Sequence, residues 1–94
     1  MKSYFLDQLT DEASVRVALS NDLPKWVEPW LLKDDRGDVV AYFDVSQSVE
    51  GMVSIQADLS GRHHGEEHLV IQVLKNLQDK LGGVVTDDDD NVIS

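Results

Sequence analysis

Hydrophobic and polar residues alternate in two neighbouring stretches in the middle of the chain. Each stretch places four apolar residues on one face: Val39, Ala41, Phe43 and Val45 in the first, and Val53, Ile55, Ala57 and Leu59 in the second. A period of two with β-branched and aromatic residues is typical of half-buried strands. The connection between them, residues 46–51, is short and polar. The pattern therefore predicts an antiparallel hairpin.

Downstream of the hairpin the period changes to that of a helix. Apolar residues recur three and four positions apart from Leu69 to Leu81, which is the spacing of one helical stripe. Acidic residues in the first turn and lysines toward the end complement the helix macrodipole. Glycines at 82 and 83 are expected to end the helix, because glycine readily adopts the left-handed conformation found after the last helical turn. We expect a helix over 66–81 and a further strand at 83–86.

The N-terminal third is compatible with two arrangements. In the leading one, residues 2–9 form a strand and residues 10–12 cap a helix that runs toward Asn21. The result is an α+β fold, a four-stranded antiparallel sheet with helices on one face, in the ferredoxin-like order β–α–β–β–α–β. The alternative opens with a helix and builds a β-meander through 14–20, 30–33 and the central hairpin before the final helix.

Length and charge narrow the possible functions. The 94 residues contain no linker or repeat and predict a single domain, 1–94, with 87–94 as an acidic tail or a last strand. Eighteen acidic residues against eight basic ones give a formal net charge of −10. Direct nucleic-acid binding needs clustered lysine and arginine, and here these residues are scattered. The charge also disfavours adsorption to anionic membranes.

The sequence lacks several motifs on which common classes of enzyme depend. There are no cysteines, which excludes disulfides, thiolate catalysis and cysteine-ligated zinc. The glycine-rich nucleotide loops and the serine elbow do not occur either. No apolar run is long enough for a membrane span or a secretory signal. We expect a cytoplasmic protein that is not an enzyme and needs no cofactor.

Three histidines gather at the predicted start of the long helix. The segment His64-x-x-Glu67-His68 has the letter pattern of inverted zinc metalloproteases, in which two histidines on a helix share the metal and the glutamate acts as general base. However, Gly65 interrupts the segment, and the histidines fall opposite the apolar stripe. A polar helix cap is the simpler interpretation. The alternative is a metal site on His64, Glu67 and His68, or a small-ligand site that uses the His63–His68 cluster.

A run of aspartates near the C-terminus also resembles a metal-binding motif. Asp87, Asp89 and Asn91 match the first three ligand positions of an EF-hand loop. Val92 replaces the required glycine, and no bidentate glutamate follows. We interpret the run as a solvated turn, after which Val92 and Ile93 fold back as a last strand.

Size and charge favour a protein-interaction module, such as an inhibitor, an immunity-type protein or a regulatory protein. An acidic surface accelerates encounter with a basic protein partner. Trp26 and Trp30 are candidate anchors because tryptophans are frequent at interface hot spots, although we favour a core position for at least one of them. Asp44 and Asp58 point outward from the predicted hairpin. These four residues are therefore the candidate contacts with the partner.

The oligomeric state is left open between a monomer and a homodimer. Val40, Tyr42 and Met52 fall on the outer face of the predicted hairpin. A small-ligand-binding domain could dimerise through this patch, which is a third interpretation of the sequence.

Overall fold

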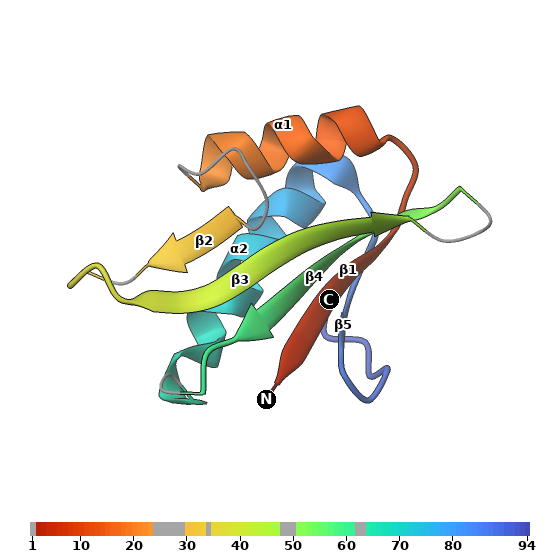
Figure 1. Ribbon diagram of the computed structural model, residues 1–94. Coiled ribbons are helices and arrows are strands. Elements are labelled where there is room, and N and C mark those ends of the chain that lie inside the picture. The colour runs from red at the N-terminus through yellow and green to blue at the C-terminus, as the bar shows by residue number, and fades with distance from the viewer. Residues whose placement is uncertain (1, 24–29, 34, 48–50, 62–63) are drawn as a thin grey trace.

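Five strands and two α-helices make up the described part of the chain, which comprises residues 2–23, 30–33, 35–47, 51–61 and 64–94 of a computed structural model (Figure 1). The fold is therefore α+β. In chain order the elements are β1 (Ser3–Leu9), α1 (Glu12–Asp22), β2 (Trp30–Lys33), β3 (Val39–Gln47), β4 (Val53–Leu59), the 3₁₀ turn η1 (His64–Glu66), α2 (Glu67–Leu81) and β5 (Val84–Asp87).

The strands form one antiparallel sheet in the order β2-β3-β4-β1-β5. The predicted hairpin is confirmed, since β3 and β4 pair with Val45 opposite Ile55. The N-terminal strand β1 lies between β4 and β5, so that Leu6 is opposite Ile55 on one side and Val85 on the other. One row of apolar side chains thus runs across four strands.

The sheet differs from the predicted four-stranded one. Trp30–Lys33 adds a fifth strand, β2, at the edge beside β3, which the alternative arrangement includes and the leading one omits. The opening helix of that alternative is wrong, because residues 3–9 form β1. Helix α1 follows as the leading arrangement predicted. The ferredoxin-like order itself is not confirmed.

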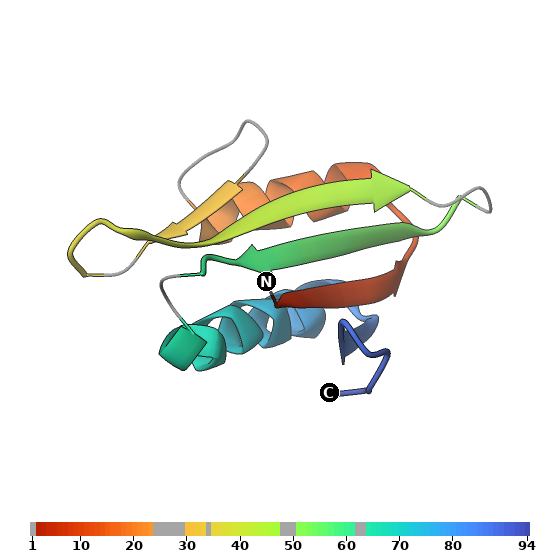
Figure 2. The same ribbon diagram turned by 60° about the horizontal axis from the view of Figure 1, so that its bottom comes forward.

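Both helices pack against one face of the sheet (Figures 1 and 2). Val70, Leu74 and Leu77 of α2 are completely buried, as the apolar stripe predicted. Val15 and Leu19 of α1 belong to the same core. Burial of apolar surface contributes about 25 cal/mol per Å², and here it is concentrated between this face and the two helices.

The C-terminal residues fold back along β5. The Ile93 N–H donates to the Val85 carbonyl oxygen at 2.7 Å, and the Val85 N–H donates to the Ser94 carbonyl oxygen at 3.1 Å. Val92 forms an isolated bridge with Thr86. These residues form a short pairing along the outer edge of β5 without making a further strand.

Candidate functional site

The face of the sheet opposite the helices carries polar and aromatic side chains. Because side chains alternate along a strand, the cross-strand register identifies which residues share this face. We call it the open face, since none of the described helices covers it (Figure 2). Its members are Leu31, Tyr42, Asp44, Ser46, Ser54, Gln56, Asp58, Ser3, Phe5, Asp7, Val84 and Thr86.

Asp58 is held in place by two neutral donors on the open face. The Ser3 hydroxyl donates to Asp58 Oδ1 at 2.7 Å, and the Gln56 amide donates to the same oxygen at 3.0 Å. No described residue donates to Oδ2. The carboxylate is thus oriented by one oxygen while the other can accept a hydrogen bond from another molecule.

The remaining aspartates of the open face lie on β1 and β3. Thr86 Oγ1 donates to Asp7 Oδ2 at 3.2 Å. Asp44, which is half-buried, lies opposite Gln56 in the register. Within the described ranges, neither Asp7 nor Asp58 forms an ion pair, and the pair between Arg16 and Glu12 lies on α1 instead. At Asp7 and Asp58 the open face therefore presents negative charge that neutral donors position but do not compensate.

An exposed aromatic ring stands beside these carboxylates. Tyr42 is 42% exposed and lies opposite Asp58 on one side and Leu31 on the other. Sequence reasoning proposed Asp44 and Asp58 but missed Asp7 and the position of Tyr42 beside Asp58. Alternation alone placed the tyrosine on the outer face of the hairpin. Which residues lie beside Tyr42 follows only from the strand register.

Of the two tryptophans, Trp30 belongs to the core. Its side chain is 1% exposed, and its indole N–H donates to Ser20 Oγ at 3.3 Å. The Arg16 guanidinium lies 5.7 Å from the ring centroid. Trp30 therefore links β2 to α1 and leaves no surface for a partner to contact. Trp26 falls outside the described residues.

The structure separates the two histidines of the predicted metal site into different elements. His64 begins the 3₁₀ turn η1, whereas His68 lies in α2, which begins at Glu67. A 3₁₀ turn has three residues per turn rather than 3.6, so the two positions do not share a continuous α-helical face. His68 is exposed and Glu67 is half-buried. The side chain of His64, like residue His63, lies outside the described part, and the metal site stays a prediction.

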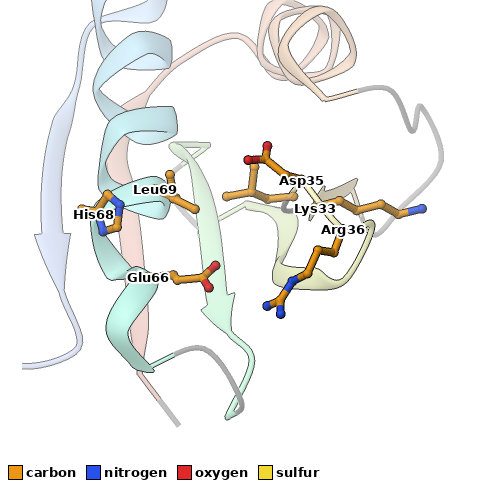
Figure 3. Close-up of a pocket in the computed structure, with 7 residues that line it drawn as sticks. Lys33, Asp35, Arg36, Glu66, His68 and Leu69 are labelled. Atoms are coloured by element: carbon orange, nitrogen blue, oxygen red, sulfur yellow. The ribbon is translucent and has the colours of Figure 1, made fainter.

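An open cleft of about 560 Å³ lies between the start of α2 and the turn from β2 to β3 (Figure 3). Glu66, His68 and Leu69 contribute from the helical side. The opposite wall includes Lys33, Asp35 and Arg36, and Figure 3 shows Glu66 extending from its helical turn toward that wall. Two cations, a histidine and two carboxylates give the lining a mixed charge, which points to no single class of ligand.

The aspartate run at the C-terminus is organised as a turn. Asp87 Oδ1 accepts hydrogen bonds from the N–H groups of Asn91 and Asp89, both at 2.9 Å. The Asn91 amide donates to Asp87 Oδ2 at 3.3 Å. The hydrogen bond from the Asn91 N–H is the largest of the contributions that lower the pKa of Asp87. These bonds account for the position of Asp87 and support the interpretation as a solvated turn.

The apolar patch suggested for dimerisation is smaller than predicted. Val40 is completely buried, and Met52 is half-buried. Tyr42 is the exposed member of the three, and it lies beside Asp58 rather than within an apolar surface.

Comparison of the chain with models of known protein families, with curated proteins and with solved structures finds no match. Among the described residues, no helix combines the length and the apolar character needed to cross a membrane.

Proposed function

We propose that the protein is a small acidic interaction module that binds a basic segment of a partner protein on its open face. One observation carries this proposal: the carboxylates of Asp7, Asp44 and Asp58 share a helix-free sheet face with the exposed ring of Tyr42. An inhibitor, an immunity-type protein or a regulatory protein would act in this way. The proposed activity is binding and involves no catalytic step.

Charge favours a basic partner over the other possible occupants. A second copy would bring three further carboxylates against the first three, and like charges across an interface are unfavourable. Phosphate groups of nucleic acid would be repelled for the same reason. A segment rich in lysine or arginine is instead attracted, and its encounter with the face is accelerated by a net charge of −10.

The size of the open face sets the expected strength of the complex. Five strands about 4.8 Å apart give a face roughly 20 Å across, and seven residues that rise about 3.3 Å each give a length of roughly 23 Å. Such a patch covers about 400–500 Å², less than the ~800 Å² per partner of a standard interface. We therefore expect a transient, salt-sensitive complex in which a peptide segment is sufficient for binding.

The test is an NMR titration of the isotope-labelled protein with a synthetic peptide that carries both lysine and arginine. The amide shifts should concentrate on β1, β3 and β4. The double variant Asp44→Asn/Asp58→Asn should weaken binding by about fivefold or more, since charge-assisted hydrogen bonds are lost. Asp35→Asn/Asp79→Asn is the matched control, because it removes the same charge from the β2–β3 turn and from α2.

The control pair should change affinity by less than about twofold, as expected for exposed charges outside the contact. If the two double variants lost affinity equally, the peptide would be held by general electrostatic attraction alone. That result would overturn the proposal. Shifts confined to Asp87–Asp90 would also contradict it, because they would move the binding site to the acidic turn.

A further inference from the structure

We infer that Tyr42, Asp44 and Asp58 form a subsite for an arginine side chain, so that the partner's basic segment is recognised through arginine in preference to lysine. The inference rests on the proposed function and specifies the residue type that the open face selects. It is carried by the register of β3 and β4 and by the hydrogen bonds of Asp58.

The register brings an aromatic ring and two carboxylates around one point. Tyr42 is directly opposite Asp58, and Cβ atoms of such cross-strand partners lie about 5 Å apart. Asp44 follows Tyr42 two residues along β3 on the same face, and is therefore the diagonal neighbour of Asp58. A side chain that approaches the tyrosine ring thus lies beside the directly opposite Asp58 and one diagonal position from Asp44.

The carboxylate of Asp58 is oriented before a partner arrives. Ser3 and Gln56 both donate to Oδ1, which fixes the plane of the group and leaves Oδ2 without a donor among the described residues. A pre-oriented acceptor loses less conformational entropy on binding. Ser3 belongs to β1, so the subsite is supported from a third strand.

The geometry of these groups favours a guanidinium over an ammonium. Guanidinium is planar, stacks on aromatic rings and carries several N–H donors, one of which can bond to Asp58 Oδ2 while the plane lies over the ring. Ammonium is compact and more strongly hydrated, and it gains less from an aromatic face. The 42% exposure of Tyr42 leaves part of the ring for such stacking. Leu31 is its opposite neighbour on β2.

The test compares two synthetic peptides of identical length that differ only in carrying arginine or lysine at every basic position. Calorimetry on the wild-type protein should give about three- to fivefold tighter binding of the arginine peptide, as expected for a partly exposed cation–π contact. Tyr42→Leu should abolish that preference and leave the affinity for the lysine peptide nearly unchanged. Tyr42→Phe is the matched control, since it keeps the ring and should keep the preference. Melting curves establish that the variants are folded.

The outcomes separate the two proposals. If neither peptide binds to the open face, the proposed function fails and the arginine subsite fails with it. If both peptides bind there equally well, or if the preference for arginine survives in Tyr42→Leu, the subsite alone is overturned. Loss of the preference in Tyr42→Phe would likewise contradict stacking on the ring.

Discussion

Gly83 is the residue at which the chain passes from α2 into β5 with no room for a side chain. Its φ is +92°, and a Cβ atom added there would collide with the Asp7 carbonyl oxygen and lie 2.9 Å from Leu9 Cδ2. Gly82 also has a positive φ, +79°, but a Cβ atom at that position would meet no atom within 4 Å. Substitutions at Gly82 and at Gly83 therefore separate the cost of the backbone conformation from the cost of the close approach to β1.

We expect Gly83→Ala to lower the free energy of unfolding by about 3–5 kcal/mol, because strain and overpacking add. Gly82→Ala should cost about 1–2 kcal/mol, since only the backbone conformation is unfavourable. Urea unfolding measures both. Equal losses in the two variants would show that β1 moves away from Gly83 at little cost.

At the scale of the element, helix α1 shows how a local cap resolves an ambiguous pattern. The sequence alternates as a strand would at Val15, Val17 and Leu19, yet Val15 and Leu19 are buried whereas Val17 between them is 61% exposed. The Asp11 carboxylate accepts hydrogen bonds from the Ala13 N–H at 3.1 Å and from the Ser14 hydroxyl at 2.7 Å. These bonds satisfy the helix start, and the segment is helical.

The same cap makes the stability of the protein depend on pH. The hydrogen bond from Ser14, together with those from the backbone, lowers the pKa of Asp11. A lowered pKa in the folded state means that the cap stabilises the protein above the ordinary carboxyl pKa, about 4. This stability is lost as the pH falls through the folded-state pKa.

Asp11→Ala should therefore lower the melting temperature by a few degrees at pH 7, and the difference from the wild type should shrink toward pH 3. Asp11→Asn keeps an acceptor oxygen that does not titrate, so its deficit at pH 7 should be smaller. Thermal unfolding at several pH values measures these differences. A deficit of Asp11→Ala that is the same at pH 3 and pH 7 would exclude the charged cap as its cause.

At the scale of the whole molecule, the excess of negative charge opposes folding and attracts the proposed partner. The formal net charge is −10, and the molecule measures 37 × 28 × 22 Å. The Debye length at 0.1 M salt is about 10 Å, which is shorter than any of these dimensions. Moderate salt therefore screens the repulsion between carboxylates that lie farther apart than this length.

Raising sodium chloride from about 0.02 M to about 0.3 M should increase the melting temperature, because self-repulsion in the compact state is reduced. The same change should weaken binding of the basic peptides. Thermal unfolding and calorimetry at matched salt concentrations measure the two effects. A melting temperature that falls with salt would mean that attractive ion pairs outweigh the repulsion.

The sequence by itself determined the elements whose signals are local. Alternation identified β3 and β4, the 3.6-residue period identified α2, and the glycine pair identified its end. These features follow from the preferences of neighbouring residues and from which side chains avoid water. The acidic charge and the absence of cysteine were also available from the sequence alone.

Only the tertiary structure decided which distant residues meet. Ser3 and Asp58 are 55 residues apart, and their contact depends on β1 entering the sheet beside β4. The same pairing adds Asp7 to the open face, and the pairing of β3 with β4 places Tyr42 against Asp58. The burial of Trp30 likewise required β2 to pack beneath α1. Register within a hairpin follows from the hydrophobic pattern and the turn, but which strands distant in the sequence become neighbours depends on how the sheet and helices pack together.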